Sequence, residues 1–367
     1  MKAFGILVAT LCLALAGCGV KGAPMPPSLH LPQPPQDLRA IRQGNKVTLF
    51  WSAPRQTTDG EAIRHGGSTR ICRKISAQIE SSPLKECSAV IGAVPSPAAS
   101  AGAQTPPQMT FTDSLTSALE SANPTGAAQY AVEALNSQDK SAGLSNQVGV
   151  PLAPAPAPPM DLKAEVKADG IHLSAEAAGS PAPNPALRFS YRFYRQNIPS
   201  QPGQLPALVA EVPATTELRA LDQSFAWEAK YSYHVTPATT VLSSSGAALA
   251  TVEGNDSAPV EVFAHDVFPP AAPTGLEAVF SGLAKQAYID LSWNANTEPD
   301  LAGYNVYRRE ADGAPLKINN DLVKTSTFRD TKVLGGHTYL YAVSAVDLRG
   351  NESAKSKEAS EQVPTSF

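Results

Sequence analysis

The residues whose types and spacing could support catalysis or metal binding are few in this chain of 367 residues. Glu298, Asp300 and Asp347 are the best candidates, because two carboxylates on neighbouring loops can hydrolyse a glycosidic bond. A hard cation such as Ca²⁺ also takes carboxylates, but it wants six or more oxygen ligands. The three acids stand in turn-like segments, where acidic residues are ordinary. We therefore predict neither a catalytic site nor a metal site.

The histidines and nucleophiles add no further candidate. Six histidines occur singly, at positions 30, 65, 172, 234, 265 and 337. None has the paired spacing of a His-Glu-x-x-His zinc site, and the chain has no Gly-x-Ser-x-Gly elbow, phosphate loop or dinucleotide fingerprint. The sequence predicts a protein that is not an enzyme and binds no cofactor.

The N-terminus has the pattern of an export signal. Lys2 precedes an uncharged apolar run over residues 4–16, which is shorter than the roughly 20 residues of a membrane-spanning helix. The Leu-Ala-Gly-Cys sequence that ends at Cys18 resembles the lipobox of bacterial lipoproteins. The resemblance implies a signal peptide over 1–17, a lipid on Cys18 and, because Gly19 follows instead of aspartate, the outer membrane. An ordinary signal peptide or an uncut apolar anchor is the alternative.

Residues 18–34 are rich in proline and can build neither a helix nor a strand ladder, so we predict an extended tether. Its start, Cys-Gly-Val-Lys-Gly-Ala-Pro, resembles very small lipoproteins associated with the outer-membrane lipopolysaccharide translocon. That resemblance implies an accessory role in lipopolysaccharide export as one alternative function. Without residues 1–17 the chain has 28 basic and 33 acidic residues, a net charge of −5 that argues against nucleic acid as a partner.

The rest of the chain repeats itself three times. Segments 128–136, 231–237 and 339–347 alternate apolar or aromatic residues with others, as a strand with one face in a core does. Other matched segments follow in the same order along the chain. They are 47–51 with 289–293, 69–73 with 191–195 and 304–308, 83–85 with 315–317, and 110–113 with 327–330. Three copies predict three all-β domains.

This pattern resembles fibronectin type III domains, which are immunoglobulin-like sandwiches of seven antiparallel strands. The resemblance implies an all-β fold of tandem sandwiches with Trp51 and Trp293 in their cores. It also implies a tyrosine corner at Tyr231 and Tyr339, where the hydroxyl bonds back to the chain. The first copy has Ala128 at this position, and the central copy lacks the tryptophan.

Proline-rich junctions separate the copies. We predict a signal peptide over 1–17 and a proline-rich tether over 18–34. Fibronectin type III-like domains follow over 35–150, 151–268 and 269–367, of which the second is degenerate.

Cys72 and Cys87 remain in the predicted exported body, and such a pair invites a disulfide. The repeat places Cys72 on one strand and Cys87 on the next. Those two strands would form an antiparallel hairpin, in which a cross-strand bond is geometrically conceivable. Two free thiols are the alternative.

Two tyrosine pairs are the remaining functional hint. In Tyr191 with Tyr194, and in Tyr304 with Tyr307, one ring of each pair can face outward and contact protein or sugar. Packing against neighbours on the same sheet is the alternative.

The sequence thus predicts a lipid-anchored envelope protein that acts as a non-catalytic interaction or scaffold module. Its partners would be the membrane, through Cys18, and an envelope protein or polysaccharide. An accessory polysaccharide-binding lipoprotein and an accessory factor of lipopolysaccharide export are the alternatives.

Overall fold

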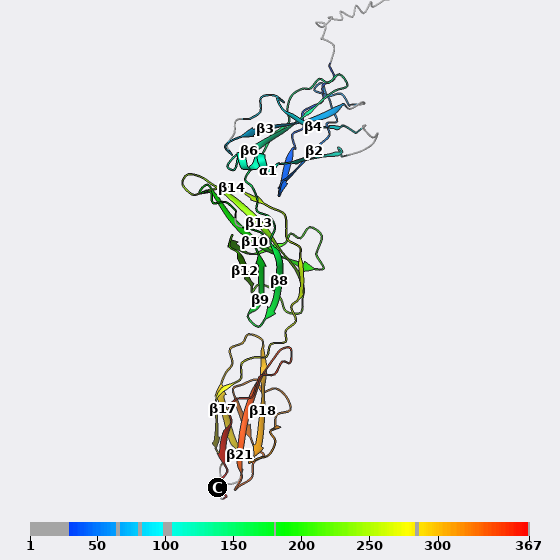
Figure 1. The fold of residues 1–367 in the computed structure, drawn as a ribbon. Helices are drawn as coiled ribbons and strands as arrows, with labels where there is room; N and C mark the ends of the chain where they lie inside the picture. The colour runs from blue at the N-terminus through cyan, green and yellow to red at the C-terminus, as the bar shows by residue number, and fades with distance from the viewer. Residues whose placement is uncertain are drawn as a thin grey trace, which may run out of the picture. The chain divides into compact units, whose positions relative to one another are not determined.

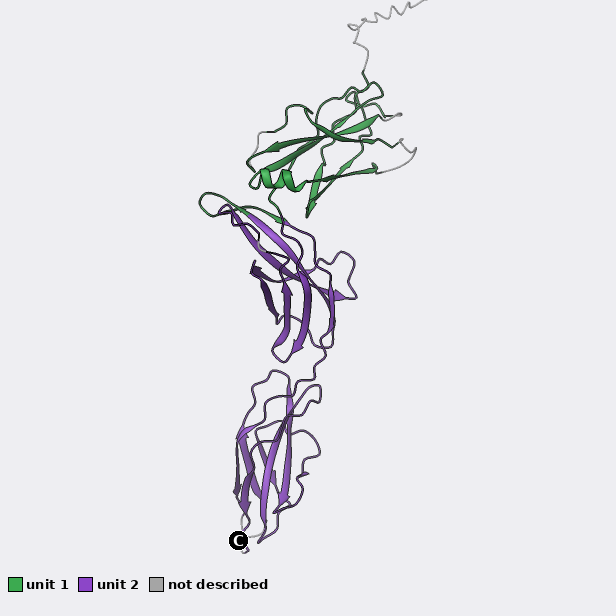
Figure 2. Cartoon of the chain, viewed as in Figure 1, with its two compact units in different colours: residues 1–154, 241–252 green, residues 155–240, 253–367 purple. Residues whose placement is uncertain are grey.

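The structure is a computed structural model that describes residues 29–63, 67–79, 83–97, 105–179, 181–282 and 286–365. The predicted signal peptide, Cys18 and most of the predicted tether lie outside these residues. Among the residues that are described, no helix is long and apolar enough to cross a membrane. The chain divides into two compact units, residues 1–154 with 241–252 and residues 155–240 with 253–367 (Figure 2).

The first sandwich lies in the first unit and consists of two antiparallel sheets (Figure 1). Its strands are β1 (Arg39–Gln43), β2 (Lys46–Ser52), β3 (Ser68–Ser76), β4 (Val90–Pro95), β5 (Gln108–Ser114), β6 (Ala127–Ala134) and β7 (Val148–Pro151). One sheet has the order β1-β2-β5 and the other has the order β4-β3-β6-β7. Alternate residues of β2 point inward, so that Val47, Leu49 and Trp51 are fully buried.

A short helix, α1 (Ser117–Ala122), connects β5 to β6. The hydroxyl of Thr116 caps its N-terminus. Glu120 points inward from this helix, and its Oε1 lies 2.6 Å from Nη2 of Arg42 on β1. The Arg42 guanidinium also donates to the carbonyl of Pro151, at the end of β7. One buried cation therefore joins the first strand, the helix and the last strand.

The second sandwich has eight strands among the described residues, whereas the sequence predicted seven. They are β8 (Met160–Lys167), β9 (Gly170–Glu176), β10 (Leu187–Ile198), β11 (Ala207–Pro213), β12 (Glu217–Asp222), β13 (Lys230–Leu242), β14 (Ala248–Glu253) and β15 (Val260–Phe263). The sheets have the orders β12-β9-β8 and β11-β10-β13-β14, and β15 also pairs with β13. The extra strand arises because β13, 13 residues long, pairs with two segments that the proline-containing stretch 254–259 separates.

The third sandwich lies in the second unit. Its strands are β16 (Thr274–Phe280), β17 (Ile289–Asn294), β18 (Leu301–Glu310), β19 (Leu316–Lys317), β20 (Thr327–Asp330), β21 (Thr338–Asp347) and β22 (Ala359–Gln362). The sheets have the orders β16-β17-β20 and β19-β18-β21-β22. Trp293 of β17 packs edge-on against Tyr304 of β18, with ring centroids 5.1 Å apart, and both belong to the core.

These sheets confirm the predicted fold class. The chain is all-β, with tandem antiparallel sandwiches of the fibronectin type III kind, and each sandwich has its own hydrophobic core. Strand β7 ends at Pro151, and Leu152 belongs to the first core. The first sandwich therefore extends slightly beyond residue 150, because Leu152, directly after the last strand, packs in its core.

The three tryptophans of the chain are divided among the sandwiches. Trp51 and Trp293 are buried in the first and third cores. Trp227 lies in the loop before β13 of the second sandwich, where it packs edge-on against Phe225 with centroids 4.8 Å apart. Each sandwich thus contains one indole ring.

Candidate functional site

One group of polar side chains recurs in all three sandwiches. It consists of an arginine, an aspartate and the inner tyrosine of the alternating strand, and in each copy the same aspartate oxygen accepts from both partners. The copies are Arg73, Asp113 and Tyr130, then Arg195, Asp222 and Tyr233, and finally Arg308, Asp330 and Tyr341. The arginine Nη1 lies 2.6 to 2.7 Å from the aspartate Oδ2, and the tyrosine hydroxyl lies 2.7 to 2.9 Å from it. We call each copy an Arg–Asp–Tyr triad.

The surroundings of the three triad tyrosines keep their hydroxyls protonated near neutral pH. Burial, with the aspartate as a further cause, raises the pKa of Tyr130, Tyr233 and Tyr341 well above the ordinary tyrosine value. Burial also opposes ionisation of Asp222, but hydrogen bonds from Ser224 and Tyr233 outweigh it and lower the pKa of this carboxyl. In the second sandwich a tyrosine that stays protonated and a carboxylate that stays charged do not exchange protons, and in all three copies the hydrogen bonds of the triad join strands.

The tyrosine corner is present in two sandwiches. The hydroxyl of Tyr339 accepts the backbone N–H of Leu334, and the hydroxyl of Tyr231 accepts that of Ala226. The first sandwich has the buried Ala128 there. Helix α1 stands in the same connection between strands, so the Glu120–Arg42 pair fastens this end of the first sandwich.

The structure brings Asp300 and Asp347 together with Asp266, a residue that the sequence patterns did not single out. One carboxylate oxygen from each lies within 4.8 Å of the others. However, Asp347 Oδ1 accepts the backbone N–H groups of Arg349 and Asn351, at 2.8 Å each. Three carboxylates also fall short of the six or more oxygens that Ca²⁺ takes. The hydrogen bonds of Asp347 stabilise the loop that follows it, so we assign this carboxylate a structural role.

Glu298 is not part of that group, and its surroundings suit a structural role. Its carboxylate accepts the backbone N–H of Ala271 at 2.7 Å, and the side-chain amide of Asn296 lies beside it. The bond from Ala271 lowers the pKa of Glu298. The general acid of a glycoside hydrolase needs a raised pKa, so the environment of Glu298 is opposite to what that chemistry requires.

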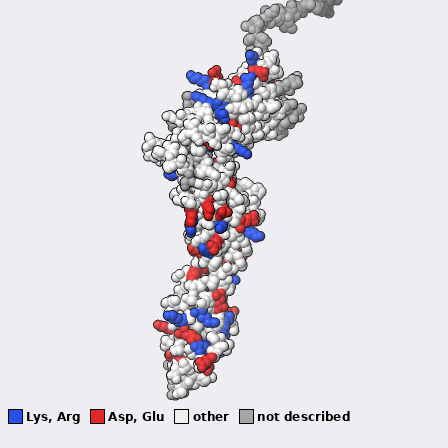
Figure 3. Space-filling model, viewed as in Figure 1, with Lys and Arg blue, Asp and Glu red and all other residues white. Residues whose placement is uncertain are grey.

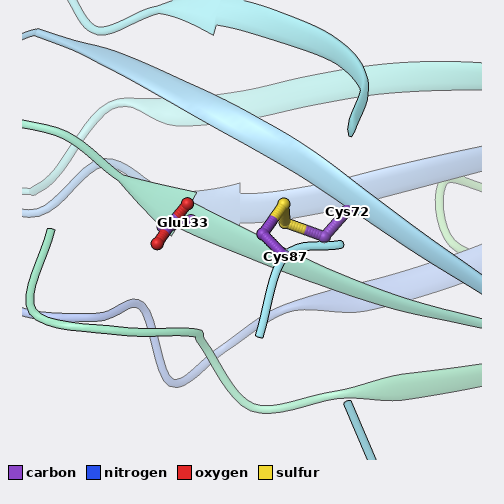
Figure 4. Close-up of side chains that lie close together, drawn as sticks. All are labelled: Cys72, Cys87 and Glu133. Carbon is purple, nitrogen blue, oxygen red and sulfur yellow. A yellow bond between two sulfur atoms is a disulfide. The ribbon is translucent and has the colours of Figure 1, made fainter. Parts of the chain in front are cut away.

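Cys72 and Cys87 form a disulfide, with Cα atoms 5.2 Å apart. Cys72 lies on β3. The sequence predicts that Cys87 lies on the next strand, but it lies in the loop before β4. The carboxylate of Glu133, on β6, lies beside the two sulfur atoms (Figure 4). Zinc takes such donors as thiolates and carboxylates, but a disulfide has no thiolate to offer. Glu133 instead accepts from the hydroxyl of Ser141 at 2.6 Å.

Replacing Cys72 and Cys87 together by alanine is expected to destabilise the first sandwich by about 3 kcal/mol, because a closed loop of this length constrains the unfolded chain. The two residues are 15 positions apart. Hydrogen exchange of the whole chain, followed by mass spectrometry of peptides from β3 and β6, measures the change. Reduction of the unmodified chain is the matched control and should have a similar effect. Unchanged exchange in both samples would contradict the prediction.

The two tyrosine pairs each have one inner and one outer ring. Tyr191 and Tyr304 are buried, while Tyr194 and Tyr307 lie on the outer sheet faces and donate to Glu253 and Glu352. Burial, with Glu253 as a further cause, raises the pKa of Tyr194 to about 12. Tyr194 also stacks on His234, with ring centroids 5.3 Å apart. The outer rings therefore belong to polar networks on the sheets. This agrees with the alternative that the tyrosines pack against neighbours on the same sheet.

The histidines that the structure describes lie apart from one another. Four of them each face one carboxylate, and the pairs are His30 with Glu61, His172 with Asp169, His265 with Glu228 and His337 with Glu310. His65 and Cys18 lie outside the described residues. On the face that Figure 3 shows, basic and acidic side chains are interspersed over both units.

Comparisons with known proteins agree with the fold. No family model matches the chain. The chain contains Fn3-like domains, and a stretch of 92 residues is 40% identical to part of an amylopullulanase of Thermoanaerobacterium saccharolyticum. A match over 92 residues to exoglucanase B of Cellulomonas fimi is 37% identical. These matches cover 25% of this chain but only 7% and 8% of the two enzymes, so the chain spans less than a tenth of the length of these relatives.

Two solved structures are similar as well. An Fn3-like protein from Clostridium thermocellum is 37% identical, with 26% of this chain and 96% of that chain covered and a TM-score of 0.23. The FN1–FN3 domains of chicken CNTN1 are 15% identical, with 91% of this chain and 100% of that chain covered and a TM-score of 0.25.

Proposed function

We propose that this chain is a lipid-anchored, non-catalytic envelope protein whose tandem sandwiches present binding surfaces to a partner. The observation that carries the proposal is the recurrence of the Arg–Asp–Tyr triad. It gives an arginine, an aspartate and a tyrosine of each sandwich a structural role, and binding would then fall to loops, outer sheet faces and strand edges. The similarity to short stretches of much longer glycoside hydrolases supports an accessory role for such modules.

The anchor in this proposal is a lipid on Cys18 in the outer membrane, which the lipobox-like sequence supports. Cys18→Ser is expected to leave the signal uncut or to release the protein from the membrane fraction, because the acyl chains have no attachment point. Cys12→Ser, in the predicted signal peptide, is the matched control and should be processed and anchored as the unmodified chain is. Fractionation and mass spectrometry of the N-terminus measure both. A processed, membrane-bound Cys18→Ser protein would sink the assignment.

The partner we propose is an envelope protein, and a polysaccharide is the second candidate because the relatives named above are glycoside hydrolases. In the second sandwich the outer face carries the Tyr194 ring, stacked on His234, and the Arg192 guanidinium, paired with Glu253, and a ligand on this face would meet both groups. Crosslinking in cells, followed by mass spectrometry, distinguishes the candidates. Recovery of lipopolysaccharide-export components would favour an accessory role in lipopolysaccharide export. Recovery of glycan alone would favour polysaccharide binding.

A further inference from the structure

The third sandwich differs from the other two at one edge. In the first sandwich β4, six residues long, packs against β5, and in the second sandwich β11, seven residues long, packs against β12. The corresponding strand of the third sandwich, β19, has only two residues. An open cleft of about 690 Å³ lies here, between the loop that contains β19 and the strand β20. Its size falls within the range of ligand pockets.

The cleft has an apolar wall and a strand edge. Leu316, which is 70% exposed, and Ile318 line it on the side of β19. Phe328 and Arg329 line it on the side of β20. A leucine this exposed next to a partly buried phenylalanine provides a place for an apolar side chain of a ligand.

The main chain of β20 is available on this side. In the described residues β20 pairs with β17 alone and ends its sheet. The backbone N–H of Trp293 donates to the carbonyl of Ser326. This bond fixes which residues of β20 bond to β17, because every second residue of an antiparallel strand bonds to its partner strand. Thr327 and Arg329 therefore direct their backbone groups away from β17. Arg329 lines the cleft, whereas the carbonyl of Thr327 accepts the hydroxyl of Thr325. An extended main chain laid along β20 would find hydrogen-bonding groups there.

The charges of the lining favour an acidic ligand. The lining has five basic residues, Arg308, Arg309, Lys317, Arg329 and Lys332, and two acidic residues, Glu310 and Asp330. Arg309 and Arg329 are also paired with Glu358 and Asp290 outside the lining. Lys317 lies near enough to Glu352 to help lower the pKa of that carboxyl. Lys332 has no ion pair within the part of the chain that the structure describes, so a carboxylate can reach its amine without displacing another.

We propose that an extended, acidic polypeptide segment of a partner binds this cleft by adding to the free edge of β20. It covers the edge of β20, as β4 and β11 pack beside β5 and β12 in the other two sandwiches, although those two strands hydrogen-bond to β3 and β10. Carboxylates of the segment lie near Lys332 and Lys317, and an apolar side chain lies against Leu316 and Phe328. This inference rests on the proposed interaction role and names a partner class for it. If no peptide binds the cleft, the anchoring and crosslinking tests of that role are unaffected.

The test uses the full chain and a defined probe, an acetylated and amidated peptide of alternating valine and glutamate, about nine residues long, which lies within the usual range of strand lengths. The same peptide with lysine in place of glutamate is the control for charge. Arg329→Pro removes the backbone N–H that faces the cleft, whereas Arg329→Ala keeps it and removes the side chain. Lys332→Glu reverses one of the available charges. Titration calorimetry and hydrogen exchange at Arg329 are the readouts.

We expect saturable binding of the glutamate peptide, with slowed exchange at Arg329. Arg329→Pro should weaken binding about tenfold, Arg329→Ala should weaken it clearly less, and Lys332→Glu should weaken it severalfold. Thermal unfolding of each variant shows whether the third sandwich is intact, and Lys332→Glu keeps the test valid if Arg329→Pro unfolds. Equal binding of the lysine peptide, equal loss in the two Arg329 variants, or no saturable binding overturns the proposal. A concentration-dependent dimer that Arg329→Pro abolishes would replace it with pairing between two copies.

Discussion

Replacing Glu120 by alanine is expected to destabilise the first sandwich by about 3 to 5 kcal/mol, which is typical for the loss of one partner from a buried ion pair. The side chains of Arg42 and Glu120 are only 5% and 10% exposed. Burial raises the pKa of Glu120 and lowers the pKa of Arg42, and each charge partly offsets the effect on the other. Without Glu120, the arginine keeps its desolvation cost and loses the charge that compensates it.

Hydrogen exchange of peptides from β1 and β6, in the full chain, measures this loss. Glu61→Ala is the matched control, because Glu61 pairs with His30 on the surface with its side chain 60% exposed, and it should change stability by less than about 0.5 kcal/mol. A double change, Arg42→Met with Glu120→Leu, should recover a large part of the loss, because it removes both charges. If Glu120→Ala matches Glu61→Ala, the pair does not hold the sandwich together.

Asp222→Ala should have a comparable effect on the second sandwich, again about 3 to 5 kcal/mol. The carboxylate is 1% exposed, and it accepts from Arg195, Tyr233 and the backbone N–H of Ser224. Its removal leaves the hydroxyl of Tyr233 with no acceptor and leaves Arg195 with the hydroxyl of Ser224 in place of a charge, at a cost for each. Asp169→Ala in the same sandwich is the control, because its side chain is 61% exposed beside His172. Exchange of peptides from β10 and β13 reports the difference.

The stability that Asp222 provides should also depend on pH. The pKa of Asp222 is lower in the fold than the ordinary value of 3.8, because hydrogen bonds and Arg195 outweigh the effect of burial. Because the folded pKa is lowered, the contribution is fully present above the unfolded value of about 3.8 and is lost as the pH falls through the folded value. The gap in stability between the unmodified chain and Asp222→Ala should therefore narrow below a pH of about 3.8. A gap that stays constant down to a pH of about 2 would contradict this sign.

Much of the fold could be predicted because alternation and repeat order both depend on burial. Val47, Leu49 and Trp51 match Ile289, Leu291 and Trp293 since each set fills one inner face of a sheet. The inner tyrosines of the three triads also lie in the repeated strand. A side chain whose burial recurs in every copy leaves a periodic signal in the sequence.

The rest depends on pairs that are far apart in sequence. Asp222 was missed because its strand does not have the Thr-Phe-x-Asp pattern that contains Asp113 and Asp330. A usable signal was the spacing, since the aspartate precedes its tyrosine by 11 residues in the second and third sandwiches and by 17 in the first. The extra six residues correspond to the length of α1. Asp266 lies close to Asp300 and Asp347 because of the geometry of their loops. No local sequence pattern predicts that geometry.

The division of the three tryptophans gives the chain an optical property. Indole emission depends on the polarity around the ring, and each sandwich has one such ring in a different setting. Trp51 is fully enclosed, Trp293 is 5% exposed, and Trp227 is in contact with Phe225 and near Phe268. Three single-tryptophan versions of the chain would therefore report the melting of each sandwich separately, without any added dye. Fluorescence could then show whether the sandwiches lose their structure one at a time or together.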